Sequence, residues 1–301
     1  MKVIYGINKI KKLNKPVVAL GVFDGVHRGH AYILKNTVGI ARRIRGTAVA
    51  LTFDPHPQKE GSLTSLEHRL RLIEGLGIKV CIVINFNRNF ARIPARDFIK
   101  KILVKKLGPA YICVGEDFRF GKGASGDVSL LKESVGKYNF QLRIFKAVRA
   151  GGRKISSSYI RRLIIRGELQ AAQKLLARPV SVLGTVVKGS SLATKLGFPT
   201  ANINPHHEIL PASGIYAVKV ILGGRIFKGA CSIGTSPTFS SSGKNKIEVY
   251  IFNFQRDIYG KYLEVQFIKK IRQQQKFASV QLLTQQVKKD ILKVQRLFPH
   301  L

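Results

Sequence analysis

The chain has 301 residues, of which 45% are hydrophobic and 9% aromatic, so it has enough apolar material for two packed cores and lacks the composition of a disordered protein. No apolar run approaches the roughly 18 residues that suggest a membrane span, and the N-terminal residues lack the apolar core of a signal peptide. Lys and Arg outnumber Asp and Glu by 52 to 16, which gives a net charge of +36 and a surface that attracts polyanions.

The first half of the chain alternates short apolar runs with helical patterns. We expect strands at residues 16–22, 47–53, 80–84 and 110–114, and helices at 30–45, 65–76, 95–107, from 156 and at 167–177. This alternation predicts a parallel sheet with helices on both faces, because each strand is a continuous apolar run that must be buried on both sides. None of the three cysteines belongs to a CxxC pair, so we expect no disulfide framework, no cysteine metal site, and a reducing, cytoplasmic location.

The pattern changes after Arg178-Pro179, where proline breaks the last of these helices. We expect one domain over residues 1–178 and a second over 179–301. Strand-like runs follow at 182–187, 215–222, 226–233, 247–254 and 262–267, and they predict an antiparallel β-barrel or sandwich. Residues 279–298 predict an amphipathic helix that packs an apolar stripe on this β structure; the stripe comprises Val280, Leu283, Val287, Ile291, Val294 and Phe298.

The segment 21–30 reads GVFDGVHRGH and follows the first predicted strand directly. Its glycines allow the backbone to approach a ligand, and the start of the next helix offers free N–H groups to a phosphate. His27 and His30 are three residues apart, so on a first helical turn they would share a face. Two imidazoles aimed at one anion can donate hydrogen bonds to charge that develops on a phosphoryl group.

These ten residues resemble the signature of the HxGH nucleotidyltransferases, and specifically the FAD synthetase module of the bacterial bifunctional riboflavin kinase/FAD synthetase family. Three further segments resemble that module in order: TFDPHP at 52–57, GEDFRFG at 115–121 and GRKISSSYIR at 152–161. The resemblance implies a Rossmann-like N-terminal domain that transfers the adenylyl group of ATP to FMN, giving FAD and pyrophosphate. The attacking FMN phosphate is already anionic, so positioning and charge neutralisation suffice without a protein base.

The resemblance also implies roles for individual residues of this half. His27 and His30 would stabilise the transition state. The ATP-binding residues would be Gly21, Phe23, Asp24, Gly25, Ser157, Ser158 and Arg161. The flavin-side residues would be His56, Asp117, Phe118 and Arg119.

The second half carries its own motifs, GTVVKG at 184–189 and LGFPTANI at 196–203. These resemble the riboflavin kinase module of the same family, which implies a C-terminal antiparallel β-barrel that phosphorylates riboflavin to FMN with ATP. Further segments at 211–218, 233–239, 247–254 and 257–261 continue the resemblance.

By that resemblance, Gly189 and Thr200 would bind ATP, and Thr200 and Asn202 would hold the nucleotide-bound Mg²⁺, a cation that prefers hard oxygen ligands. Glu248 would lie next to the riboflavin 5′-hydroxyl. An alcohol is a poor nucleophile, so this reaction benefits from a positioned base. Arg272 would lie on the flavin side.

Some residues depart from the kinase pattern. Ala193 and Thr194 stand where the family usually has Gly-Arg, Gln274 replaces a Glu, and Asn253 replaces a common Asp. These changes leave Thr200, Asn202 and Glu248 in place. An FAD synthetase with a weakened or inactive kinase half is therefore the alternative interpretation.

Two other classes of protein share single features with this chain. A class I aminoacyl-tRNA synthetase-like RNA binder also has a His-x-Gly-His turn, but this chain has no recognisable tRNA-reading domain. A basic nucleic-acid-binding protein would explain the charge, yet the basic residues are spread along the whole chain without a dense arm or tail. We therefore expect riboflavin, FMN and ATP as partners, no membrane and no specific nucleic acid, and we leave the oligomeric state open.

Overall fold

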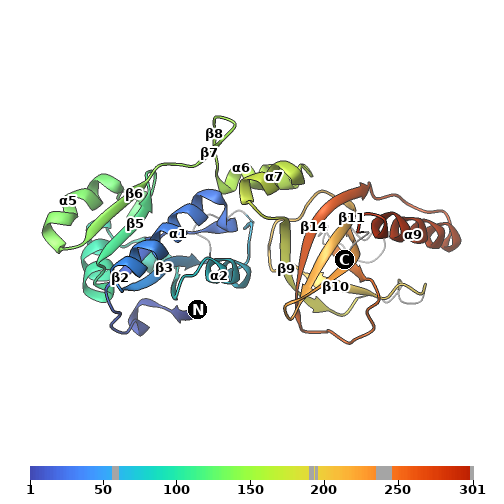
Figure 1. Ribbon diagram of the computed structural model, residues 1–301, viewed down its shortest axis with the longest axis horizontal. Coiled ribbons are helices and arrows are strands. Elements are labelled where there is room, and N and C mark those ends of the chain that lie inside the picture. Colours follow the sequence, from blue (N-terminus) through green and yellow to red (C-terminus); the bar gives the residue numbers. More distant parts are fainter. Residues whose placement is uncertain (56–60, 190–192, 194–195, 235–245, 299–301) are drawn as a thin grey trace. The chain divides into compact units, whose positions relative to one another are not determined.

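The computed structural model describes residues 1–55, 61–189, 193, 196–234 and 246–298 (Figure 1). The chain divides into two compact units, Met1–Glu60 with Leu66–Ser157, and Gly61–Ser65 with Ser158–Leu301. This division places residues 158–178 with the second unit, whereas the sequence pattern placed them in the first domain. The functional boundary between residues 178 and 179 stays a prediction.

The first unit is built on a six-stranded parallel sheet in the order β1-β4-β3-β2-β5-β6. Its strands are β1 (Lys2–Tyr5), β2 (Pro16–Leu20), β3 (Thr47–Asp54), β4 (Val80–Asn85), β5 (Tyr111–Gly115) and β6 (Gln141–Phe145). Its main helices are α1 (Arg28–Arg43), α2 (Leu66–Gly75), α4 (Ala95–Asp97), which continues as the π-helical segment η3 (Phe98–Leu107), and α5 (Val128–Tyr138).

Both faces of this sheet are covered, as the continuous apolar strands predict. In β2, Val17 and Ala19 pack into a core with residues of α1 and α2, while Val18 and Leu20 pack into a second core with residues of η3 and α5. All five residues of β2 are buried. Alternate side chains of one strand therefore feed two separate cores, and this confirms the predicted parallel sheet with helices on both sides.

Four strands and the helix α5 of this unit were not predicted. β1 and β6 form the two edges of the sheet, and β6 alternates polar and apolar residues with none fully buried. An edge strand needs no continuous apolar run, which is why the criterion used on the sequence missed both edges. Helix α5 and the exposed hairpin of β7 (Arg149–Ala150) and β8 (Arg153–Lys154) were missed as well.

The second unit is a closed six-stranded antiparallel barrel in the order β10-β13-β12-β11-β14-β9. Its strands are β9 (Val180–Val187), β10 (Thr200–Asn204), β11 (Gly214–Leu222), β12 (Arg225–Gly234), β13 (Lys246–Ile251) and β14 (Tyr262–Arg272). Helices α6 (Ser157–Ile165) and α7 (Leu169–Leu176) precede it. The barrel confirms the predicted closed β structure and decides between the two expected architectures.

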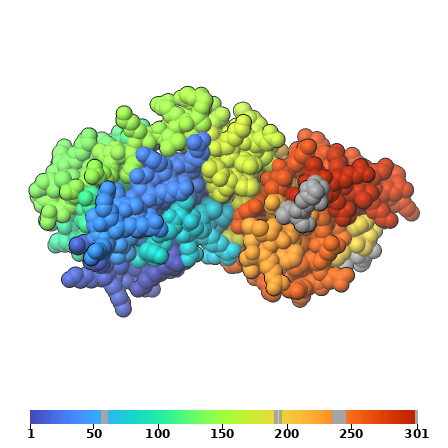
Figure 2. Space-filling view, viewed as in Figure 1, coloured from blue at the N-terminus to red at the C-terminus, as the bar shows by residue number. Residues whose placement is uncertain are grey.

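Helix α9 (Val280–Gln295) lies on the outside of the barrel, shown in red in Figure 2. Val294 and Phe298 are buried against Ala217 and Phe252, as the predicted stripe requires. Val280 is 55% exposed. Its place in the stripe was predicted wrongly, because the first turn of the helix is not covered by the described barrel strands. In the described part of the chain, no helix combines the length and apolarity needed to cross a bilayer.

Candidate active sites

The connection between β2 and α1, residues 21–27, is the histidine loop. Its backbone enters left-handed conformations at Phe23 (φ 55°), Gly25 (φ 72°) and Val26 (φ 36°). Such a φ is a strained outlier for a β-branched residue such as Val26. Phe23 and Val26 are only 1% and 5% exposed, so burial of their side chains holds the backbone in this conformation. Strain of this kind persists where the surrounding structure over-determines the geometry, and it clusters at functional sites.

His27 is the N-cap of α1. Its Nδ1 accepts a hydrogen bond from the backbone N–H of His30 at 3.3 Å. Because Nδ1 accepts this bond, it carries no proton, and the ring proton of His27 lies on Nε2. The rings of His27 and His30 stack with centroids 3.6 Å apart and planes 17° apart. The stacked rings place both imidazoles on one face of the first helical turn, as the sequence predicts.

The pKa of His30 is held well below its ordinary value of 6.5, first by burial of the ring, then by the neighbouring His27 and then by Arg69. Its Nδ1 is buried and has no hydrogen-bond partner among the described residues. The stacked pair therefore presents neutral imidazoles. Such groups act on a phosphoryl oxygen as N–H donors and not as cations.

Two glycines of the motif make room for the aromatic rings of the loop itself. A Cβ at Gly21 would lie 3.0 Å from the ring of Phe23, and a Cβ at Gly29 would lie 3.1 Å from Cε1 and 3.2 Å from Nδ1 of His27. Both distances are shorter than ordinary van der Waals contact. Gly29 is thus required by the capping position of His27, which gives the spacing of the HxGH motif a local structural reason.

The predicted ATP residues of the serine motif begin helix α6. The hydroxyl of Ser157 donates to the backbone carbonyl of Asp24 at 2.9 Å, so this motif meets the histidine loop although the two are 133 residues apart. Asp24 itself is 1% exposed. Ser158 is exposed and Arg161 is buried, and both belong to the second unit. Their predicted contacts with ATP stay predictions.

The predicted flavin-side residues lie after β5, in the segment 116–127. Asp117 forms an ion pair with Lys154 of β8, and Arg119 pairs with Asp127, the N-cap of α5, at 3.1 Å. The rings of Phe118 and Phe120 stack with centroids 5.5 Å apart. His56 lies outside the described residues.

The second candidate site lies on strands β10 and β13 of the barrel. Asn202 pairs directly with Glu248, and Thr200 with Tyr250. Side chains that face each other across an antiparallel pair lie on the same side of the sheet. The buried residues of β13 are Ile247, Val249 and Ile251, so Glu248 is on the outer face of the barrel. The register thus places Thr200, Asn202 and Glu248 on one outer face, although 46 residues separate the last two.

Gly189 fits closely beneath Asn202. A Cβ built on Gly189 would lie 2.0 Å from Nδ2 and 2.7 Å from Oδ1 of Asn202. Only glycine allows the amide to occupy this position. The predicted ATP residue and the predicted metal ligand are therefore parts of one local structure, and neutral hard oxygens at Thr200 and Asn202 suit Mg²⁺.

Burial raises the pKa of the Glu248 carboxyl above its ordinary value of 4.5, and the nearby Lys246 opposes this in part. A carboxylate with a raised pKa is a better base than an ordinary one. Cys231, on the adjacent strand, is fully buried as a thiol, and the same burial raises its pKa far above the ordinary value. It therefore adds no charge next to Glu248.

Arg272, predicted on the flavin side, directs its donors to other groups. Its Nε and one terminal nitrogen bind the carboxylate of Asp290 on α9 at 2.7–3.0 Å, and the other nitrogen binds the carbonyl of Gln273 at 2.9 Å. Its contact with flavin stays a prediction. Gln274 accepts a hydrogen bond from Ser213 at 3.0 Å and lies so close to Gly234 that a Cβ there would be 1.9 Å from its Oε1. Of the other departures, Thr194 lies outside the described residues.

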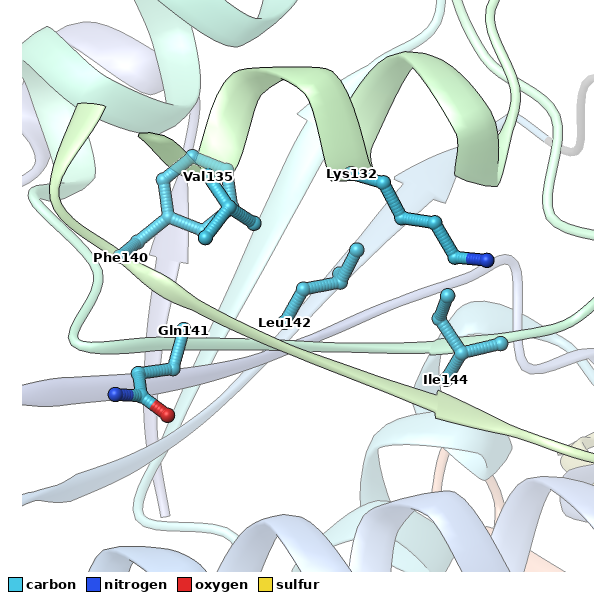
Figure 3. A pocket seen from close by; sticks show the side chains of 6 residues that line it. All are labelled: Lys132, Val135, Phe140, Gln141, Leu142 and Ile144. Atoms are coloured by element: carbon cyan, nitrogen blue, oxygen red, sulfur yellow. The ribbon is translucent and has the colours of Figure 1, made fainter. Parts of the chain in front are cut away.

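A cavity of about 470 Å³ lies elsewhere in the first unit, between α5 and β6 (Figure 3). Leu142 and Ile144 lie on the side of β6 that faces α5, where Lys132 and Val135 also line the cavity. It contains none of the predicted site residues. Within the described ranges, no three His, Cys, Asp or Glu side chains gather as a metal site.

Two residues of the first site escaped the sequence analysis. Arg69 is a completely buried guanidinium on α2, and Lys154 is the partner of Asp117. Arg69 stands in a helix with Arg71 two residues on, and nothing in the sequence separates the buried arginine from the exposed one. Lys154 belongs to a motif that was recognised for its serines.

Comparisons with known proteins match both halves of the chain. A family model described as FAD synthetase matches residues 9–159, and one described as riboflavin kinase matches residues 176–298. Proteins named bifunctional riboflavin kinase/FMN adenylyltransferase are similar along nearly the whole chain. The one from Buchnera aphidicola of Schizaphis graminum is 38% identical and covers 99% of each chain, and the one from Escherichia coli K12 is 34% identical and covers 99% of this chain and 98% of its own.

A relative of the same name from Bacillus subtilis is 34% identical over 95% of this chain and 94% of its own. Among solved structures, a crystal structure from Streptococcus pneumoniae named macrolide-efflux protein superposes with a TM-score of 0.83 at 28% identity, covering 98% of this chain and 99% of that one. The similarity thus extends over both units of the chain.

Proposed function

Because the chain belongs to the family of bifunctional riboflavin kinase/FMN adenylyltransferases, we infer that its two sites work one after the other. The enzyme phosphorylates riboflavin to FMN and transfers the adenylyl group of ATP to FMN, which yields FAD and pyrophosphate. The assignment of each step to particular residues is our proposal. The observation that supports it best is the pairing of Asn202 with Glu248 in one unit and of His27 with His30 in the other.

In the adenylyl transfer, a phosphate oxygen of FMN attacks the α-phosphorus of ATP, and the bond to the pyrophosphate group breaks. Charge develops on the oxygens of the α-phosphorus during this step. We propose that His27 donates from Nε2 and that His30 donates from its ring to this charge. Both imidazoles are neutral and fixed by the cap and the stack, so no reorganisation is needed when the charge appears. The loop residues Gly21, Phe23, Asp24 and Gly25 and Ser157 would line the nucleotide, and ATP contacts of Ser158 and Arg161 stay predictions.

In the kinase reaction, the 5′-hydroxyl of riboflavin attacks the γ-phosphorus of ATP. We propose that Glu248 accepts the hydroxyl proton, for which its raised pKa suits it. Mg²⁺ bound to the nucleotide would neutralise phosphate charge. Thr200 and Asn202 would hold it from the same outer face of the barrel that carries Glu248, with Asn202 seated on Gly189.

Flavin contacts of Asp117, Phe118, Arg119, His56 and Arg272 stay part of the proposal. The ion pairs of Asp117 with Lys154 and of Arg119 with Asp127 would fix the walls of the FMN side of the first site. We also keep the cytoplasm as the proposed location; the three cysteines are free and buried, which agrees with a reducing compartment. Specific nucleic acid is not part of the proposal, and the oligomeric state is left open.

Product analysis tests the order of the two steps. The purified chain is incubated with riboflavin, ATP and Mg²⁺, and the flavins are separated by chromatography. We expect FMN to appear first and FAD to follow. The alternative, a weakened or inactive kinase half, rests on Ala193 and Thr194, where the family usually has Gly-Arg, and on Gln274, an amide where the family usually has a carboxylate. FAD formation from supplied FMN but not from riboflavin would favour that alternative.

A further inference from the structure

Arg69 is the largest fully buried side chain among the described residues, at 2% exposure, and it lies beside the histidine loop. Its two terminal nitrogens donate to backbone carbonyls, one to Val22 at 3.1 Å and the other to Phe53 at 2.9 Å. Val22 is the residue after which the strained loop begins, and Phe53 lies at the carboxyl end of β3. One guanidinium therefore connects the carboxyl ends of the two central strands.

The carbonyl of Val22 is held twice. Besides Arg69, the hydroxyl of Thr52, which is completely buried, donates to it at 2.8 Å. Immediately after this carbonyl the backbone turns left-handed at Phe23, and it does so again at Gly25 and Val26. A strained segment needs fixed ends to stay in its conformation. Two donors on one carbonyl supply such a fixed end.

The charge of Arg69 is balanced inside the unit. Burial lowers its pKa, and Asp24 and Asp54, the latter 3.7 Å from a terminal nitrogen, raise it. An arginine stays protonated under these conditions, because its ordinary pKa is above 12. The thiol of Cys81 faces it from β4 and stays neutral, since burial raises its pKa to about 12. The guanidinium is thus a fixed positive charge that water does not reach.

We propose that Arg69 is a positioning residue for adenylyl transfer. It ties the ends of β2 and β3 together and thereby holds the histidine loop in the conformation in which the rings of His27 and His30 stack. The proposal rests on the assignment of these histidines to FAD formation. It adds a residue that reaches no substrate and acts through the backbone. The fixed charge has a second effect: burial of the ring is the main cause of the low pKa of His30, and the nearby charge of Arg69 adds to it, so the site keeps a neutral ring there.

The test uses the full-length enzyme and its two activities. Arg69→Met removes both hydrogen bonds and the charge, and Arg71→Met, two residues on, is the matched control because Arg71 is an exposed arginine of the same helix paired with Glu67. We expect Arg69→Met to lower kcat for FAD formation by about 100-fold, the loss that follows from a displacement of about 1 Å. The KM for ATP should change much less, riboflavin kinase activity should stay within about twofold, and Arg71→Met should match the parent.

Two milder variants separate position from charge. Arg69→Lys keeps the charge, but one ammonium group does not reproduce the paired hydrogen bonds of the guanidinium to the carbonyls of Val22 and Phe53. We expect it to restore only part of kcat while the pKa of His30, followed by NMR, stays low. Thr52→Val removes the other donor to Val22 and should lower kcat about fivefold, as the loss of one hydrogen bond does, without moving the pKa of His30. In Arg69→Met that pKa should rise, although burial and His27 keep it below its ordinary value, and the acid limb of the FAD-formation profile should move to higher pH.

The kcat values, the titration of His30 and the kinase activity together test the role of Arg69. If Arg69→Met and Arg71→Met have the same kcat and the same His30 titration, or if kinase activity falls together with FAD formation, Arg69 is not a positioning residue of this site. A His30→Ala variant is measured in parallel. Full FAD formation by that variant would overturn the assignment of the histidines, whereas a slow His30→Ala with a fast Arg69→Met would overturn only the inference on Arg69.

Discussion

The contact between Gly189 and Asn202 allows a quantitative prediction. In Gly189→Ala, the new Cβ would lie 2.0 Å from Nδ2 of Asn202, so the amide would have to move by about 1.4 Å to reach ordinary contact at 3.4 Å. Misplacement of a positioned group by about 1 Å costs about 100-fold in rate. We therefore expect kcat of the riboflavin kinase reaction, measured by chromatography of FMN, to fall at least about 100-fold, and FAD formation from supplied FMN to stay unchanged.

A double-mutant cycle identifies the cause of that loss. If the added methyl group acts by displacing Asn202, then Gly189→Ala should cost almost nothing further in an Asn202→Ala background. Gly136→Ala is a matched control, because a Cβ at Gly136 meets nothing within 4 Å. Additive losses in the cycle, or a Gly189→Ala enzyme with normal kinase activity, would refute the idea that this glycine exists to seat the amide.

Three other substitutions test the remaining assignments. His30→Ala should slow FAD formation by about 100-fold or more, the cost of one oxyanion donor, and leave kinase rates unchanged in the same preparation. Glu248→Gln should slow the kinase by about 100-fold or more. Because the pKa of Glu248 is raised above 4.5, the carboxyl of the parent enzyme loses its proton only at higher pH, and the parent rate should rise with pH as it does so. The variant should lack this rise. Asp290→Ala removes the carboxylate that binds the Arg272 guanidinium, which is only 19% exposed. The free energy of unfolding, measured in urea, should fall by about 3 kcal/mol. An unchanged unfolding midpoint would show that this ion pair does not hold α9 on the barrel.

Periodicity and apolar runs predict the elements whose side chains are buried on a regular pattern, and they miss those that are not. The central strands of the parallel sheet are continuous apolar runs, so they were recognised, while the edge strands β1 and β6 were not. Strand β10 was missed for a different reason. Thr200 and Asn202 face outward toward the site, and their polarity hides the strand that carries them.

The sequence predicted the residues of the candidate sites but not their arrangement or protonation. Motifs and resemblance named His27, His30, Thr200, Asn202 and Glu248, and the structure brings the last three onto one face because of a register that no sequence pattern encodes. The protonation state of the histidines depends on burial of the His30 ring and on the hydrogen bond that His27 accepts as the N-cap. Both are set by the three-dimensional structure and cannot be derived from the sequence. Arg69 was out of reach for the same reason, since nothing local distinguishes it from Arg71.

The scarcity of acidic residues helps to explain where they stand. Only 16 Asp and Glu oppose 52 Lys and Arg, yet several of the acids accept hydrogen bonds from two or more groups of the fold. Glu208, 4% exposed, accepts from the backbone N–H groups of Ser65 and Leu183. Asp127 caps α5 with two hydrogen bonds.

Asp290 shows the same logic, because it binds the guanidinium of Arg272 and the amide of Gln286 while only 8% exposed. Most lysines and arginines of the described residues are exposed or half-exposed, where a single charge has little effect on stability. Removing a buried carboxylate such as Glu208 or Asp290 should therefore disturb the fold far more than neutralising any one exposed lysine.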